Sequence, residues 1–203
     1  MRVKNWLKTV PSLVIIGTIL FLVLSVGSGL LFWGSNFAHN MVHHQLSEQK
    51  ISFPPKGSQG LDPKEFPGLQ RYAGQAVDNG PKAKAYADQF IAVHLKGIGG
   101  GKTYSELSAQ ALADPKNADL QQTVSTMFRG ETLRGLLLYA WGWSVVGAIA
   151  FYVAIASLVG ALAVLAALIL GFVLHERQVH RAAVPATNGS ISGREERVPV
   201  TVG

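Results

Sequence analysis

Two long stretches of the chain contain no charged residue. The first, residues 12–34, is SLVIIGTILFLVLSVGSGLLFWG. As a helix rising about 1.5 Å per residue it would be roughly 34 Å long, enough to cross a hydrocarbon core of ~30 Å. The apolar part of a cleaved signal peptide is only about 7–15 residues long and ends at a small-residue motif, which is not found here. The pattern therefore predicts an uncleaved transmembrane helix at 12–34, preceded by a short segment at 1–11.

The second uncharged stretch, residues 136–174, is too long for one membrane crossing. It has 39 residues, whereas one span needs about 20. Two short spans joined by a turn, or one helix extending beyond the bilayer, would both account for it. No Pro, Asn or Asp marks a turn. The aromatic residues gather in the first half, as in an interfacial belt, at Tyr139, Trp141, Trp143 and Tyr152. We therefore predict a transmembrane helix at 150–174 and an apolar helical extension at 136–149.

The intervening residues, 35–135, carry mostly helical patterns. Phe37, Met41, Val42 and Leu46 are spaced as one helical face, which predicts that the first helix continues past residue 34. Residues 54–68 contain four prolines and three glycines and are expected to be irregular. Three further helices are expected. The first begins at Gly80, has an apolar face of Tyr86, Phe90 and Val93, and ends at a left-handed Gly97. The second covers 104–113, and the third runs from Asp114-Pro115 to Phe128, followed by a break at Gly130.

The segment KGIGGGKTYSEL, residues 96–107, is similar to a phosphate-binding loop because Gly101, Lys102 and Thr103 are adjacent. That motif also needs a glycine five residues before Gly101 and a hydrophobic strand before the loop. Here Lys96 occupies the glycine position, and a helical pattern precedes it. Thr103 and Glu106 instead have the spacing of a helix-capping box. The glycines are therefore predicted to connect two helices rather than to bind a nucleotide.

The distribution of charge predicts the topology. Arg2, Lys4 and Lys8 precede the first apolar stretch, and Arg177 and Arg181 follow the second. Short segments rich in Lys and Arg stay in the cytoplasm, so both termini are expected there and residues 35–135 outside. The expected fold class is an all-α plasma-membrane protein in which two transmembrane helices frame a small, mostly helical extracytoplasmic domain. The second helix extends beyond the bilayer, and residues 175–203 are expected to be a disordered cytoplasmic tail.

Composition narrows the choice of function. The 203 residues are 48% hydrophobic and 15% charged, and no part is basic enough to indicate a nucleic-acid partner. Cysteine is absent, which excludes disulfides, thiolate zinc sites and thiol catalysis. The sequence has no G-x-S-x-G motif or other catalytic set. An enzyme is therefore not expected, and no cofactor is predicted.

GGGKTYSEL at residues 99–107, followed by FRGETLRGLLL at 128–138 and a long apolar helix, resembles an uncharacterised family of actinobacterial two-span membrane proteins. The resemblance is clearest over residues 97–175. It implies an N-terminal anchor, a short extracytoplasmic region with a GGKTY-type segment, and an Arg-rich entry into the second anchor. Some members carry the automatic label "aromatic ring-opening dioxygenase". That chemistry needs an iron site of two His and a carboxylate, or an equivalent, and the resemblance assigns no such residues here.

Two groups of residues are candidates for a site. His39 and His43 lie four residues apart on one helical face, the spacing of a metal-binding pair, and Glu48 could add a carboxylate. The pattern is not H-E-x-x-H, so a polar, membrane-proximal face is the plainer interpretation. The second group is a stripe of small residues that would permit close helix packing, at Ala156, Gly160, Ala163, Ala167 and Gly171. It could pack on the first helix, where Ser25 and Gly29 form a similar pair, or on a partner.

Tyr139, Trp141 and Trp143 add an apolar surface beyond the bilayer, a feature that usually marks an interface. The sequence therefore predicts a non-enzymatic accessory or scaffold subunit of a larger envelope complex, such as a transporter or a respiratory assembly. The expected partners are other integral membrane proteins and the lipid bilayer, with a homo-oligomer as a further option. The alternative is a membrane-anchored extracytoplasmic sensor that binds a ligand or metal through His39 and His43.

Overall fold

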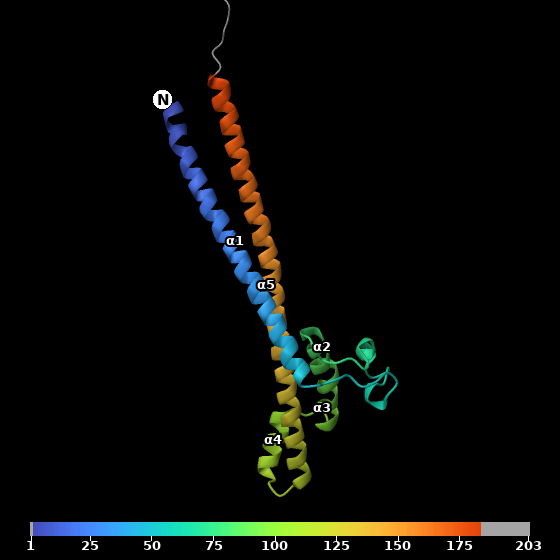
Figure 1. Cartoon of the computed structure of the whole chain (residues 1–203). Coiled ribbons are helices and arrows are strands. Elements are labelled where there is room, and N and C mark those ends of the chain that lie inside the picture. The colour runs from blue at the N-terminus through green and yellow to red at the C-terminus, as the bar shows by residue number, and fades with distance from the viewer. Residues whose placement is uncertain (1, 184–203) are drawn as a thin grey trace, which may run out of the picture.

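Two long antiparallel helices form the frame of the molecule. The computed structural model describes the backbone of residues 2–183 and the side chains of residues 12–180. α1 (Arg2–Glu48) and α5 (Ala118–Ala183) lie against one another over much of their length (Figure 1). Both are long and apolar enough to span a membrane. Between residues 2 and 183 the elements are helices and no strand forms, so the expected all-helical fold with two long apolar helices is confirmed.

α1 and α5 approach closely because small residues recur at every seventh position of their contact. On α1, Ser28 and Ser35 are buried. On α5 the corresponding buried residues are Ala140, Gly147, Ala154 and Ala161. A Cβ added at Gly147 would lie 2.9 Å from His39 Nδ1 and 3.1 Å from Ala38 Cβ. A seven-residue repeat keeps one seam facing the partner helix, as in coiled coils.

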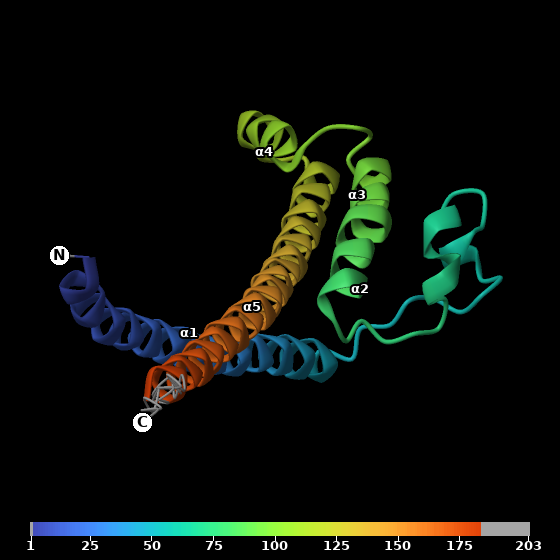
Figure 2. The same cartoon turned by 90° about the horizontal axis from the view of Figure 1, so that it is seen from above.

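The residues between α1 and α5 form a small helical domain beside the N-terminal half of α5 (Figures 1 and 2). Its elements are the 3₁₀ helices η1 (Gln59–Leu61) and η2 (Pro67–Tyr72), the helical segment made of α2 (Gly80–Ala85), the π-helical η3 (Tyr86–Ile91) and α3 (Ala92–Ile98), and α4 (Tyr104–Ala113). Phe53 stacks on Tyr72 and meets Tyr86 edge-on, with ring centroids 5.2 and 5.1 Å apart. These rings join residues 49–79 to the helices.

The buried face of the α2–η3–α3 segment differs from the predicted one. Tyr86 and Phe90 are half-buried, but Val93 is 36% exposed. Besides Gly80 and Ala85, the buried residues form a row of four at intervals of four positions: Ala83, Ala87, Ile91 and Leu95. In an α-helix such a row drifts by about 40° per step, because a turn has 3.6 residues. A π-helix has i→i+5 hydrogen bonds and more residues per turn, which keeps the row of four aligned with α5.

The end of α3 lies beyond the predicted Gly97, which is helical. The left-handed residues are Gly100 (φ 59°) and Gly101 (φ 81°). The Gly101 N–H donates to the Lys96 carbonyl at 2.8 Å and the Gly100 N–H to the Gly97 carbonyl at 3.1 Å. These are the two hydrogen bonds of a Schellman motif. The glycine run therefore ends one helix, three residues later than expected.

The predicted capping box at the start of α4 is confirmed. The Thr103 N–H donates to Glu106 Oε2 at 2.7 Å, and the Glu106 N–H donates to Thr103 Oγ1 at 3.3 Å. The first of these bonds, with the Thr103 hydroxyl, holds the pKa of the Glu106 carboxyl below its usual value. The segment KGIGGGKTYSEL is thus a connection between two helices, as expected.

α5 begins at Ala118 rather than at Pro115 and continues through Gly130 without a break. Asn117 Oδ1 accepts the Leu120 N–H at 3.1 Å and caps the helix. Glycine inside a helix costs only about 1 kcal/mol relative to alanine, and at Gly130 the missing side chain makes room for Leu95. Residues 175–183 of the predicted disordered tail belong to this helix, and residues 184–203 lie outside the described part of the chain.

Candidate interaction surface

The histidine pair lacks a third ligand. His39 Nδ1 donates to the Ser35 carbonyl at 2.8 Å, and His43 Nδ1 donates to the Asp78 carbonyl at 2.9 Å. Glu48, the expected carboxylate, lies instead 3.4 Å from His44. Among the residues that the structure describes, no group of three His, Asp or Glu side chains could hold a metal ion. The histidines therefore tie α1 together locally and to the chain before α2, and the sensor alternative gains no support from their geometry.

The predicted small-residue stripe does not form the contact between α1 and α5. Only Gly160 lies near that contact, where an added Cβ would be 3.5 Å from Leu24 Cδ1. The other four members, Ala156, Ala163, Ala167 and Gly171, are exposed. The helices use the seven-residue row through Ala154 and Ala161 instead, because that row keeps facing α1 along the whole contact. Ala167 and Gly171 line a crevice between the two helices beyond their contact. The packing of the stripe, within the chain or on a partner, stays a prediction.

On α1 the close contact is made by Ser28 rather than by the predicted Ser25 and Gly29. Gly29 is exposed. The Ser28 side chain is 2% exposed, and its hydroxyl donates to the Ala154 carbonyl at 2.9 Å. Hydroxyl groups bonded across helices are common where no water competes. This hydrogen bond fixes the register of α1 against α5 in their most apolar part.

The three aromatic residues of the predicted extension divide between two environments. Tyr139 is 63% exposed, and its ring meets that of Trp143 edge-on at 6.3 Å. Trp141 is half-buried, and Lys84 Nζ lies 4.6 Å from the centre of its ring. Trp141 therefore packs partly against α2 within the molecule, and its place in an interface stays a prediction.

Exposed apolar side chains form a surface on the N-terminal half of α5. We call Leu136, Tyr139, Trp143 and Val146 the upper apolar face; they are 62%, 63%, 36% and 54% exposed. A shallow hollow runs along it, lined by Tyr139, Gly142, Trp143 and Val146. Gly147, next to this face in sequence, contacts His39. The upper apolar face is therefore level with the part of α1 that follows residue 39. There Val42 and Leu46 are buried, and the exposed side chains from residue 43 on are polar, among them His43, His44, Gln45 and Glu48.

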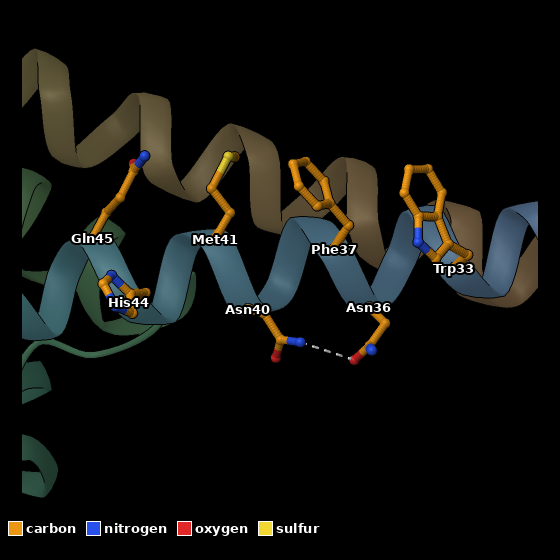
Figure 3. Close-up of a pocket in the computed structure, with 7 residues that line it drawn as sticks. All are labelled: Trp33, Asn36, Phe37, Asn40, Met41, His44 and Gln45. Atoms are coloured by element: carbon orange, nitrogen blue, oxygen red, sulfur yellow. Dashed lines mark hydrogen bonds between the residues drawn. The ribbon is translucent and has the colours of Figure 1, made fainter.

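A second apolar row lies on α1 and was missed from the sequence. Trp33 and Phe37 stack with ring centroids 5.8 Å apart and are 69% and 54% exposed. With Met41 they line one side of a groove whose other side carries Asn36, Asn40 and His44 (Figure 3). The pattern had placed Phe37 on one face with Val42 and Leu46, which are buried. Spacing alone did not show that α1 presents two apolar rows, one to α5 and one outward.

An ion-pair cluster fastens the π-helical turn to α5. Asp88 pairs with Lys84 at 2.5 Å and with Arg134 of α5 at 3.4 Å, and Arg134 also reaches Glu131 at 3.3 Å. The hydrogen bond from Lys84 is the main reason why the pKa of the Asp88 carboxyl lies below its usual value. A carboxylate held ionised in this way is a weak base, so the cluster is suited to structural attachment rather than to proton transfer.

A comparison of the chain with protein-family models, with curated proteins and with solved structures finds no match. The resemblance to the actinobacterial two-span family therefore stays a prediction. What the fold itself defines is a class: an all-helical protein with two antiparallel helices that could span a membrane. The upper apolar face lies on the second of these helices.

Proposed function

We propose that this chain is a plasma-membrane protein with two transmembrane helices, both termini in the cytoplasm and residues 35–135 outside. In this proposal it serves as a non-enzymatic accessory or scaffold subunit of a larger envelope complex, such as a transporter or a respiratory assembly. The observation that carries the proposal is the exposure of the upper apolar face at a level where α1 is polar. A water-exposed apolar surface of this kind usually marks a protein interface.

The side-chain pattern supports a bilayer around residues 12–34 and 150–174. The rings of Phe32 and Phe151 meet at 5.7 Å, so these two positions lie at the same depth. Trp33 and Tyr152 follow them and are each 69% exposed, as expected of aromatic residues at a membrane surface. With the surface there, Leu136 to Val146 lie outside the hydrocarbon core, and lipid does not cover them.

Among residues 12–180, no side chain or helix covers the upper apolar face. α1 covers one side of α5, α2 and α3 pack on another, and α4 lies across α5 from α3 (Figures 1 and 2). Tyrosine and tryptophan are frequent among the residues that dominate binding energy at interfaces. The proposed mechanism is therefore binding: Tyr139 and Trp143 dock on an integral membrane partner, and the outer domain is held beside that partner's extracytoplasmic part.

Purification of the tagged chain from its own membranes in mild detergent, followed by mass spectrometry, tests this proposal. We expect a partner in a fixed ratio to the chain. The double variant Leu136→Ser with Tyr139→Ser should weaken the binding of this partner about 30-fold and so reduce its recovery, since truncating a dominant aromatic residue of an interface costs ~2 kcal/mol or more of binding. A photo-crosslinking residue at position 139 should capture the same partner.

The variant Ile98→Ser provides the matched control. Ile98 is 47% exposed and lies on α3, away from the upper apolar face, so its replacement should leave the partner bound. Recovery of the chain alone, or equal partner recovery by the double variant and the wild type, would contradict the proposal. Metal content and ligand binding of the intact chain would then be the next measurements, because they test the sensor alternative.

A further inference from the structure

A crevice between α1 and α5 has no role in the proposed subunit interface. It lies at the end where the two helices separate, near the N-terminus (Figure 1). Its volume is about 550 Å³, within the range of small-molecule sites. The lining residues are Leu13, Val14 and Thr18 of α1 and Ala167, Leu168, Gly171, Phe172, Leu174, His175 and Gln178 of α5.

The floor of the crevice is the last contact between the helices. There the Leu168 side chain packs over Gly17, where an added Cβ would be 2.7 Å from Leu168 Cδ2. From Ala167 to Gln178 the crevice extends over 11 helical positions, or about 16 Å. With the second span at 150–174, the part from Ala167 to Leu174, about 10 Å long, lies in hydrocarbon, and the rest lies at the membrane surface.

The polarity of the lining changes along this depth. The deep part is apolar, with Leu168, Gly171 and Phe172, and the rim carries His175 and Gln178. In the placement proposed above, the deep part lies in hydrocarbon and the rim at the surface of the leaflet nearer the N-terminus. A molecule that fits this gradient has an apolar chain and a polar head.

Charge near the rim favours an anionic head. Arg177 lies between His175 and Gln178 in the sequence, beside the residues that line the rim, and Lys8 lies one turn before Ser12 on α1. Within residues 1–15 and 170–183 the basic residues are Arg2, Lys4, Lys8, Arg177 and Arg181, against Glu176 as the one acid. Each juxtamembrane Lys or Arg attracts an anionic lipid by about 1 kcal/mol.

We propose that the crevice is a binding site for one anionic phospholipid of the leaflet nearer the N-terminus. An acyl chain lies between α1 and α5 above Leu168, and the headgroup lies by Arg177 and the rim. A transmembrane helix of a partner is the poorer fit, since it would need a contact over about 20 residues, and this crevice closes before it reaches the bilayer midplane. The inference rests on the membrane placement of the proposed function but not on the existence of a protein partner.

Native mass spectrometry of the purified full chain tests the site. The delipidated protein is offered phosphatidylglycerol and phosphatidylcholine with identical acyl chains in detergent. One phosphatidylglycerol per chain should remain bound. The variant Ala167→Leu with Gly171→Leu fills the crevice and should lose it. Arg177→Gln should keep an acyl chain in place but lower the preference for phosphatidylglycerol about five-fold.

Ala166→Leu is the matched control, since Ala166 is exposed on the same helix but does not line the crevice; it should retain the lipid. Equal retention by the crevice-filling variant, or equal binding of the two lipids by the wild type, would overturn the inference. So would a wild-type chain that resists carbonate extraction, which shows that it is integral, yet retains no lipid. A chain released by carbonate would instead overturn the membrane placement, and with it the proposed function.

Discussion

At the position of Gly80 the first turn of α2 lies directly against the backbone of α5. A Cβ added there would overlap the Ser144 side chain and would lie 3.3 Å from Trp141 Cα. Ser144 is itself 9% exposed, and its hydroxyl donates to the Trp141 carbonyl at 2.8 Å. Neither neighbour can move without disturbing α5. One absent side chain therefore sets the distance between the outer domain and the long helix.

Replacement of Gly80 by alanine should destabilise the protein by about 1–3 kcal/mol, the usual cost of overpacking. The measurement is thermal unfolding of the purified chain in detergent. Gly97→Ala is the control, because Gly97 is helical and nothing lies within 4 Å of an added Cβ. That change should be neutral or stabilising by up to about 1 kcal/mol. A Gly80→Ala melting temperature at or above the wild-type value would show that α2 is not held this closely.

The ion pairs of Asp88 predict a pH dependence. The pKa of this carboxyl is lowered in the folded protein, so its contribution to stability is present above the ordinary value near 4 and is lost as the pH falls through the folded pKa. Its side chain is 31% exposed, which limits the contribution to about 1 kcal/mol. Asp88→Asn should lower the melting temperature at pH 7, and this difference should shrink towards pH 3. A difference that stays constant over that range would contradict the assignment.

For individual residues, contacts between positions close in the sequence could be predicted, and contacts between distant positions could not. The Thr103–Glu106 capping box involves residues three positions apart, so their spacing was sufficient. The His43–Asp78 hydrogen bond and the Gly80–Ser144 contact join distant parts of the chain. No local pattern distinguishes such a glycine or histidine from one that faces solvent.

Among the elements, length and type were predictable, but the face that each helix buries was not. The two long helices could be predicted because an uncharged stretch of more than 20 residues is rarely anything other than a long apolar helix. The stripe from Ala156 to Gly171 and the buried row from Ala140 to Ala161 both place small residues three to seven positions apart. Which of these two rows is buried depends on where α1 lies against α5. The π turn of η3 was also unpredictable, since it depends on fitting four residues against α5.

Because α5 buries the row through Ala154 rather than the stripe through Ala156, substitutions at these two positions should differ in effect. Ala154 is fully buried and accepts the Ser28 hydroxyl at its carbonyl, whereas Ala156 is exposed. Ala154→Leu should force the helices apart and destabilise the purified chain by about 1–3 kcal/mol. Ala156→Leu, two residues away, should change its melting temperature little. If instead Ala156→Leu is the more harmful change in the isolated chain, the register of α1 and α5 is different from that described.

For the molecule as a whole, the proposed topology can be tested directly because the chain has no cysteine. Lys116 is exposed in the turn between α4 and α5, and Val179 is 54% exposed near the other end of α5. In intact cells a membrane-impermeant maleimide should label Lys116→Cys. It should label Val179→Cys only after the membrane is permeabilised. Labelling of both positions from outside would show that the two helices do not place them on opposite sides.

The continuity of α5 has a mechanical consequence. Between Ala118 and Ala183 the chain contains no proline, and sharp kinks in helices occur mostly at proline or at local defects. In the proposed placement, with a span at 150–174, the bilayer midplane lies near residue 162. α5 then extends about 66 Å from the midplane towards Ala118 and about 32 Å towards Ala183. A straight helix that tilts about the midplane acts as a lever. A sideways displacement of the outer end moves the inner end in the opposite direction by about half as much.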